Sequence, residues 1–358
     1  MRSSKDRDLD MSGHILFIFI IVVFLAILNR RWSLFLGLVL LLWFFSFRTN
    51  DIPDTEVYEW MYNDPISRMD YNELGFLLLG YLFKAVTGAG FMTYYLFLIG
   101  SCFLLLFFAS RRLLQGEEHF GMLLLIFLSF YGFFYMGVTI RNCISEVLVL
   151  CGISLYLTTE RKWRLFLFLL FVGMASVIHK SSLFFLLLLP LWIVKIPDNA
   201  YNRIFMTCII VWLISGTGIA REIVGRISEI SMFSNYEKFS TSSEASPNLF
   251  SLQVLISLMV SFYAIRYKNL INPDYQTTYN FFLKINILGL MVLSIIWSLP
   301  TSYRFYNMFF FYNFILIYLM IFHNDGIELI KDKMAISLSV CVAYYAILIH
   351  SFSFMLMF

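Results

Sequence analysis

Residues 134–157 read FYMGVTIRNCISEVLVLCGISLYL. The apolar run after Arg141 is long enough for a helix that crosses a bilayer, and Arg141 and Glu146 are the only charged residues in the stretch. A charged side chain near the middle of a membrane helix costs about 2.5 to 3.5 kcal/mol, so the charges kept there generally line a functional site. The stretch therefore predicts a membrane helix with a site at its polar beginning.

The rest of the chain has the same apolar character. Of its 358 residues, 60% are hydrophobic and 14% are charged, and the mean hydropathy is +0.78. These values exclude a soluble domain. The net charge of +3 comes without a basic tract, which excludes a nucleic-acid-binding protein. We expect an all-α polytopic integral membrane protein in which residues 1–358 form a single transmembrane domain.

About twelve segments are apolar and long enough to cross a bilayer. They cover residues 13–29, 33–47, 91–109, 119–138, 142–158, 163–178, 182–195, 203–219, 249–265, 279–299, 305–322 and 335–356. The segment 73–88 is shorter, carries Lys84 and runs into glycines, which predicts a re-entrant or interfacial helix. Lys284 is expected near one end of its helix, snorkelling to the membrane boundary.

Lys and Arg in the short loops set the orientation, because cytoplasmic loops carry an excess of them. One topology places six basic loops in the cytoplasm: Arg30-Arg31, Arg111-Arg112, Arg161-Lys162-Arg164, Lys195 with Arg203, Arg266 with Lys268, and Lys331 with Lys333. Two longer polar loops, about 48–72 and 219–248, are then external. Aromatic side chains beside carboxylates in the first loop suit sugar rings, although an aromatic belt at the membrane boundary is the alternative.

In this topology the intramembrane cations gather on the external side. A guanidinium binds phosphate with two parallel hydrogen bonds, so Arg141 and Arg304, helped by Lys180, are the candidate ligands of a pyrophosphate. The candidates for proton transfer are Asp54, Glu73 and neutral His179. Arg48, Tyr58 and Glu146 are supporting candidates, with Glu146 expected as a buried partner of an arginine. The alternative is that the arginines only reach lipid headgroups.

We expect neither a metal ion nor a cofactor. The five cysteines all lie inside apolar runs, and no CxxC or His partner stands at a metal-ligand spacing, so the cysteines are expected to pack between helices. The chain has no P-loop, no Gly-x-Ser-x-Gly elbow and no dinucleotide fingerprint. These absences exclude the common nucleotide-dependent and serine-hydrolase sites.

Four segments together resemble the EpsG-like group of Wzy-type polysaccharide polymerases. They are Arg48 to Tyr62 with Asp54-Thr55 and Tyr58, then Glu73-Leu74-Gly75-Phe76, then Thr139-Ile140-Arg141-Asn142, and then Ala175 to Ser182 around His179-Lys180. Tyr303-Arg304-Phe305 resembles a late element of the same group. Each motif is short, but their order and spacing match from about residue 10 to 320. Asn142 departs from the Gln expected after the arginine.

The resemblance implies a polymerase in the bacterial cytoplasmic (inner) membrane, with its active site facing the periplasm or exterior. Such an enzyme moves a growing glycan from undecaprenyl pyrophosphate to the non-reducing end of a new lipid-linked repeat unit in O-antigen, capsule or exopolysaccharide synthesis. Its partners are then the undecaprenyl-pyrophosphate-linked donor and acceptor and the membrane lipid. Whether a chain-length regulator also binds is left open.

Three other functions remain as alternatives. A flippase for lipid-linked oligosaccharides also needs cations for pyrophosphate, but it needs them accessible from both faces, whereas these cluster near one. A ligase that transfers finished glycan shares the donor chemistry and differs only in the acceptor. An O-acyltransferase using His179 requires an acyl donor from the cytoplasm, on the opposite side from that residue.

Overall fold

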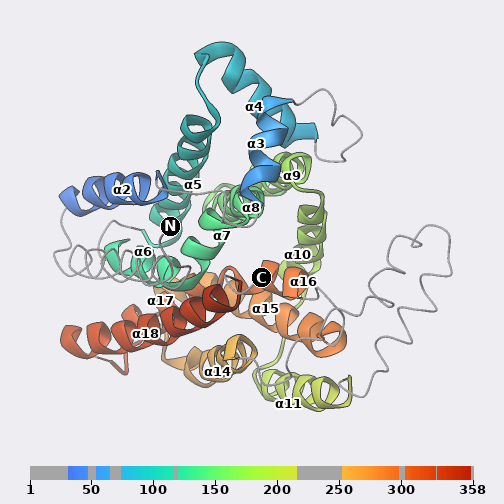
Figure 1. The fold of residues 1–358 in the computed structure, drawn as a ribbon. Coiled ribbons are helices and arrows are strands. Elements are labelled where there is room, and N and C mark those ends of the chain that lie inside the picture. Colours follow the sequence, from blue (N-terminus) through green and yellow to red (C-terminus); the bar gives the residue numbers. More distant parts are fainter. Residues whose placement is uncertain are drawn as a thin grey trace. The chain divides into compact units, whose positions relative to one another are not determined.

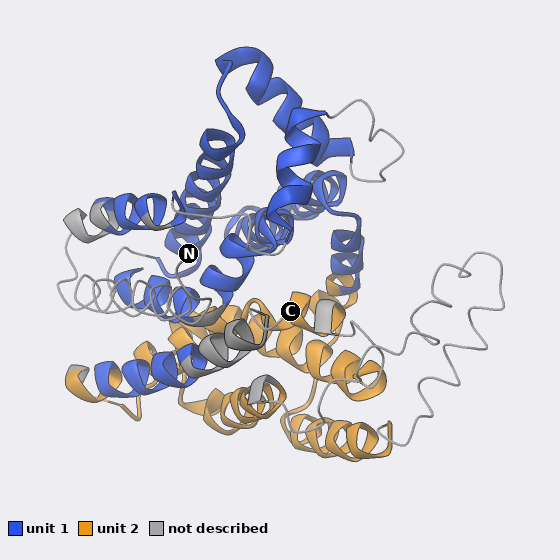
Figure 2. Cartoon of the chain, viewed as in Figure 1, with its two compact units in different colours: residues 1–187, 334–358 blue, residues 188–333 orange. Residues whose placement is uncertain are grey.

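A computed structural model describes residues 31–46, 54–64, 74–115, 120–215, 252–297, 303–327 and 329–355. Within these ranges the chain is helical, with one isolated bridge between Ile271 and Asn324, which confirms the all-α class. The predicted span 13–29 and the predicted loop 219–248 lie outside the described residues. The chain divides into two compact units, residues 1–187 with 334–358 and residues 188–333 (Figure 2). The single transmembrane domain stays a prediction.

Unit 1 is built from helices of very different lengths (Figure 1). They are α2 (Arg31–Phe45), α3 (Thr55–Asn63), α4 (Leu74–Thr87), α5 (Phe91–Leu113), α6 (Phe120–Phe127), the π-helix η2 (Leu128–Gly132), α7 (Phe133–Gly137), α8 (Ile140–Thr158), α9 (Arg161–Ile178), the 3-10 helix η3 (Lys180–Leu187) and α18 (Ile330–Met355). The predicted external loop 48–72 thus contains the helix α3. The first four residues of α18 belong to unit 2.

The α8 helix is the central helix of unit 1, and it packs against α5 and α9. Every residue from Cys143 to Ser154 is buried, because apolar or small side chains, together with Glu146, occupy all sides of the helix. A Cβ atom on Gly152 would lie 3.0 Å from the Cβ of Phe171, so glycine lets α9 approach closely. All five cysteines are buried, as expected for small packing residues.

Two arginines lie at the C-terminal end of α8, far from Arg141. Arg112 at the end of α5 donates from Nε to the Thr158 hydroxyl at 3.1 Å, and Arg164 donates from Nε to the Thr159 carbonyl at 2.6 Å. The 19 residues of α8 span about 28 Å at 1.5 Å per residue, close to the thickness of a bilayer's hydrocarbon core. Within unit 1 the structure is therefore consistent with basic loops on one membrane side and Arg141 on the other.

Unit 2 surrounds the long helix α15. Its elements are α10 (Leu188–Ile193), α11 (Asp198–Ser215), α14 (Leu252–Tyr267), the 3-10 turn η5 (Lys268–Leu270), α15 (Pro273–Ile296), α16 (Tyr303–Phe310) and α17 (Asn313–Phe322). A Cβ atom on Gly289 of α15 would lie 2.9 Å from the Cβ of Phe309, so α16 packs almost directly on the α15 backbone. Asn286 donates to the Asn313 side-chain oxygen at 2.9 Å and joins α15 to α17.

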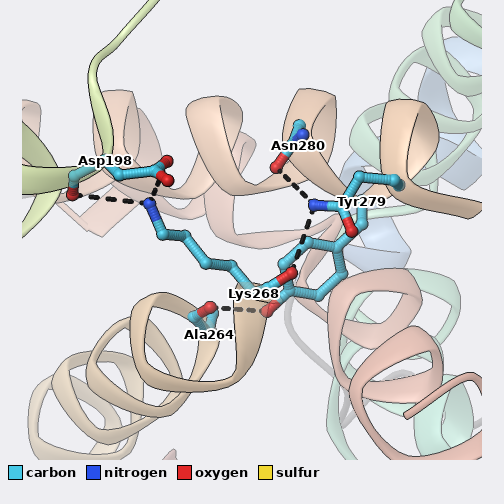
Figure 3. Close-up of polar contacts among 6 residues, drawn as sticks. Asp198, Ala264, Lys268, Tyr279 and Asn280 are labelled. Atoms are coloured by element: carbon cyan, nitrogen blue, oxygen red, sulfur yellow. Dashed lines mark hydrogen bonds and ion pairs between the residues drawn. The ribbon is translucent and has the colours of Figure 1, made fainter. Parts of the chain in front are cut away.

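An ion pair between the buried Lys268 and the exposed Asp198 holds one end of unit 2 together (Figure 3). The Lys268 ammonium lies 2.5 Å from a carboxylate oxygen of Asp198 and over the ring of Tyr201, 4.6 Å from its centroid. Gln276 donates from Nε2 to the Lys268 carbonyl at 3.1 Å and to the Asn280 side-chain oxygen at 3.2 Å. The start of α11 is therefore fixed to the turn between α14 and α15.

The loop after α17 meets the same end of unit 2. The Asn272 N–H donates to the His323 carbonyl at 2.8 Å, and Lys333 donates from Nζ to the Phe322 carbonyl at 2.8 Å. Three loops that the charge pattern places on one membrane side, 195–203, 266–268 and 331–333, are thus brought together at one end. Lys268, Lys333 and the backbone of Asn272 make these contacts.

The count of twelve membrane spans is not confirmed. By length and composition, four helical segments among the described residues are able to cross a membrane: Phe91–Leu113, Ile140–Thr158, Pro273–Ile296 and Phe305–Phe322. The predicted span 182–195 is a short apolar helix, Lys180–Ile193, whose first eight residues form a 3-10 helix. The predicted short helix near 73–88 is present as Leu74–Thr87, also too short to cross.

The prediction for Lys284 was wrong. Because α15 begins at Pro273, Lys284 lies in the middle of the helix and not near an end. Its ammonium donates to the carbonyl oxygens of Leu191 and Val194, both at 2.8 Å. These carbonyls lie at the C-terminal end of α10, where no further turn of helix supplies N–H groups to donate to them. Lys284 thus caps a neighbouring helix, a role that apolar periodicity alone does not reveal.

We expect Lys284→Met to destabilise unit 2 by about 1 to 3 kcal/mol, since two carbonyl groups lose a charged donor. Thermal denaturation of the detergent-solubilised protein measures this loss. Lys331→Met is the control, because Lys331 is an exposed lysine at the start of α18. Equal melting temperatures for the two variants would contradict the capping role.

Candidate functional site

The first turn of α8 holds the best-defined cation of the predicted site. The guanidinium carbon of Arg141 lies over the ring of Tyr58, 5.1 Å from its centroid, and over the ring of Phe76, 5.8 Å from its centroid. The two rings are 5.6 Å apart and come from α3 and α4. A guanidinium is attracted to the faces of aromatic rings, and neutral rings hold it in place without cancelling its charge. Three separate segments therefore position Arg141.

The α3 helix presents Tyr58 because its apolar residues recur at helical spacing. Tyr58, Met61 and Tyr62 are buried at 1 to 3% exposure, whereas Glu56 and Trp60 are exposed. Asp54 precedes the helix in the left-handed region, with φ 64°, and its side chain does not cap the helix. Asp tolerates this conformation better than most residues. The exposed Asp54 carboxylate thus lies at the N-terminal end of α3, one helical turn before Tyr58.

A second aromatic layer fixes α3 to α4 and α5. The rings of Tyr62 and Tyr94 stack with centroids 4.9 Å apart, and the Tyr62 hydroxyl donates to the Ala89 carbonyl at 2.6 Å. Burial raises the pKa of Tyr62 above its ordinary value, so this hydroxyl stays a neutral donor. Lys84 lies over the Tyr62 ring, 5.4 Å from its centroid, and donates from Nζ to the Asn63 carbonyl at 3.3 Å. These contacts hold the rings under Arg141 in place.

Gly75 brings α4 against the end of α9. A Cβ atom built on Gly75 would lie 2.5 Å from the carbonyl oxygen of Val177, closer than real Cβ atoms come. Val177 lies two residues before His179, and Phe76 follows Gly75 directly. The close approach therefore joins the segment that carries His179 to the segment that supports Arg141.

His179 and Lys180 lie at the end of α9. The His179 N–H donates to the Ala175 carbonyl at 2.8 Å and closes the helix, and an extended backbone at His179 turns the chain into η3. His179 is partly buried and Lys180 is exposed. The helices α8 and α9 pack together and are joined by the short turn at Thr159 and Glu160, so their ends far from this turn lie together. Arg141 and His179 are 18 and 20 residues from Thr159, which puts both at that end.

Glu146 faces a different side of α8 from Arg141. Five residues on an α-helix correspond to a rotation of about 140° and a rise of about 7.5 Å. Its side chain is 2% exposed and lies near Cys143 of its own helix and Tyr131 of η2. Its expected pairing with an arginine stays a prediction.

The structure brings together four of the predicted segments: α3, α4, the start of α8 and the end of α9. It does not describe the side chains of Arg48, Glu73 and Arg304. Asp54, Tyr58, Arg141, His179 and Lys180 are described, and all belong to unit 1. Arg48 and Glu73 lie outside the described residues, although Glu73 immediately precedes α4. Arg304 lies in the first turn of α16 in unit 2, and its side chain is not among those described. The meeting of Arg141 with Arg304 therefore stays a prediction.

Sequence reasoning gave no role to Gly75, Phe76 or Val177. Their signal was position: each stands within three residues of a charged candidate, Glu73 or His179. Apolar residues in an apolar chain carry no further sign of such contacts.

Comparisons with known proteins bear on the whole chain. The model of the EpsG family matches residues 31–357. Neither a curated protein nor a solved structure gives a significant match. The matched range includes every predicted site residue, so the resemblance stated from the sequence motifs is confirmed.

Proposed function

The chain belongs to the EpsG family of Wzy-like polysaccharide polymerases, and we propose that it joins lipid-linked oligosaccharide repeat units at the outer face of the cytoplasmic membrane. In this proposal the growing glycan moves from undecaprenyl pyrophosphate to the non-reducing end of a new lipid-linked unit. The product serves as O-antigen, capsule or exopolysaccharide. No metal ion takes part in the step.

One observation carries the proposal: the aromatic support of Arg141 by Tyr58 and Phe76. An arginine that only reaches lipid headgroups needs no such support from two other segments. A supported guanidinium that keeps its charge suits a pyrophosphate, because phosphate oxygens accept its parallel N–H donors. Lys180, exposed at the same end of unit 1, adds a second positive charge.

The reaction proposed for this site is a glycosyl transfer. The bond between the anomeric carbon and the pyrophosphate oxygen breaks, and both electrons leave with the pyrophosphate. Arg141, with Lys180 and Arg304, stabilises the negative charge that develops there. The acceptor hydroxyl oxygen then bonds to the anomeric carbon, whose transition state has oxocarbenium character. The hydroxyl proton passes to a base of the protein.

We assign the role of base to Asp54. Its carboxylate is exposed, does not cap α3, and lies one turn before the tyrosine that supports Arg141. Glu73 and His179 are the competing candidates. Of the two candidates that the structure describes, Asp54 is exposed whereas His179 is partly buried, so the Asp54 side chain is the more accessible to an acceptor hydroxyl.

We expect Asp54→Asn to lower the polymerisation rate by about a hundredfold or more, because general-base catalysis contributes on that scale. Asn keeps the size of the side chain and tolerates φ 64°, so the fold is expected to be unchanged. The measurement is the pH dependence of polymer formation from lipid-linked repeat units in vesicles. His179→Gln and Glu73→Gln are the comparison variants. If the fall in the polymerisation rate at low pH disappears in one of these variants and persists in Asp54→Asn, the base is the residue replaced in that variant.

Deletion of the gene followed by gel analysis of surface polysaccharide tests the function itself. A polymerase predicts loss of the ladder of chain lengths while a one-repeat band remains. Loss of all surface glycan would indicate a flippase. Accumulation of full-length polymer on the lipid carrier would indicate a ligase. Complementation with the intact gene restores the ladder and serves as the control.

A further inference from the structure

One face of α9 is apolar and exposed along its whole length. Trp163, Phe166, Leu170, Met174 and Val177 are 45 to 57% exposed, and they recur every three or four residues. The opposite face packs into unit 1, where Phe168, Val172 and Ala175 are at most 1% exposed. Residues three or four apart form one continuous stripe on a helix. In a membrane protein such a stripe contacts hydrocarbon.

This stripe ends at the site. Val177, its last residue, is the residue that Gly75 contacts, and it lies two positions before His179. Lys180 follows with an exposed ammonium-bearing side chain. From Trp163 to Val177 the stripe runs about 21 Å along the helix axis. An apolar track of that length thus leads directly to cationic side chains.

Gly173 lies beside the stripe close to its cationic end, and we call the place of its missing side chain the Gly173 notch. Gly173 is exposed, and a Cβ atom at this position would meet no other atom within 4 Å. Glycine inside a helix costs about 1 kcal/mol relative to alanine, and no helix among the described residues fills this space. The missing side chain leaves a gap beside Met174 that an elongated apolar ligand is able to fill.

We propose that the isoprenoid tail of the lipid-linked donor lies along this α9 stripe, with its pyrophosphate at the Lys180 end and its chain crossing the Gly173 notch. The inference rests on the proposed function and adds the place where the donor lipid binds. The ligand it requires is amphiphilic: an anionic diphosphate joined to a long branched hydrocarbon. The donor then enters sideways from the bilayer and never leaves it.

Charge complementarity separates this occupant from bulk lipid. The α9 stripe ends beside Lys180 and His179, at the same end of unit 1 as Arg141, so a diphosphate headgroup there meets several donors. The exposed apolar residues of α5 provide a comparison. Leu104 is 59% exposed, but α5 carries its arginines, Arg111 and Arg112, at the opposite end of the bundle from Arg141. Phospholipid is expected on α5 and the isoprenoid on α9.

Photo-crosslinking tests the placement directly. A benzophenone amino acid is introduced at Met174 and, in a matched variant, at Leu104, in the full chain in phosphatidylethanolamine–phosphatidylglycerol vesicles. The probe is radiolabelled undecaprenyl pyrophosphate. We expect labelling at position 174 that excess unlabelled probe removes, and at least fivefold weaker labelling at position 104. Equal labelling at the two positions, or labelling at 174 that no competitor reduces, would mean that α9 contacts only bulk lipid.

Filling the notch is the second test. Gly173→Leu is expected to raise the KM for the lipid-linked donor about tenfold while kcat changes little, because it blocks binding and not the chemical step. Gly100→Leu is the control, since Gly100 on α5 also has open space around its Cβ position. An unchanged KM in Gly173→Leu would refute the tail site. If deletion of the gene leaves a one-repeat band while both α9 tests fail, only the tail placement falls. If deletion removes all surface glycan, the proposed function falls as well.

Discussion

Arg141→Ala is expected to leave single repeat units on the lipid carrier and to lower polymer formation by about a hundredfold or more. Loss of one preorganised donor to a developing negative charge costs on that scale. The guanidinium is already held over Tyr58 and Phe76 before substrate arrives, so no other side chain is expected to take its place. Gel analysis of surface polysaccharide, with expression checked by immunoblot, measures the effect.

Arg141→Lys separates charge from geometry. Lysine keeps the positive charge but loses the planar fork that binds two phosphate oxygens, so intermediate activity is expected. Arg112→Ala is the matched control, because Arg112 lies at the opposite end of α8 and bonds Thr158. Wild-type chain lengths in Arg141→Ala, at normal expression, would remove Arg141 from the site.

Gly75→Ala is the second substitution expected to have a large effect. The added methyl group would lie 2.5 Å from the backbone oxygen of Val177, and backbone cannot move aside as a flexible side chain can. Overpacking of this kind costs about 1 to 3 kcal/mol. Relief requires α4 to shift away from α9, which withdraws Phe76 from Arg141. We expect a lower melting temperature together with at least a tenfold loss of polymer.

The control for this substitution is Gly100→Ala on α5. Its Cβ atom meets nothing within 4 Å, and alanine favours a helix more than glycine does. Its stability is expected to be equal to or above that of the wild type, with normal polymer. If Gly75→Ala behaves like Gly100→Ala, then α4 does not pack on α9 as closely as the structure has it.

The site was predictable where a charge stood in an apolar chain. Arg141 and His179-Lys180 were found because their cost inside a membrane demands a reason. Within unit 1, Arg141 and His179 lie at the same end of the α8–α9 pair, and that this end is external stays a prediction. Tyr58 was predicted as a supporting residue. The contact of Arg141 with Phe76 was not predictable, because Phe76 is one of 40 phenylalanines and only its position near Glu73 distinguishes it.

The place of Lys284 and the number of spans were both predicted from apolar windows. Lys284 was misplaced because the apolar window began at residue 279, whereas α15 begins six residues earlier, with Asn272 as its cap and Pro273 in its first turn. The count of twelve spans is not confirmed, because apolar composition alone does not report the length of a helix. In Lys180–Ile193 the helix is short and starts as a 3-10 helix, and composition does not report either property.

Sequence alone was sufficient to identify the all-helical membrane class, the family and the charged residues that we propose for the chemistry. Each of these follows from local properties: the length of apolar runs, the cost of a charge within them, and the order of short motifs. Only the tertiary structure decided that Tyr58 and Phe76 support Arg141, that Gly75 touches Val177, and that Lys284 caps α10. These contacts join segments far apart in the chain, and close packing, which selects among many equally apolar partners, is a property of the folded protein alone.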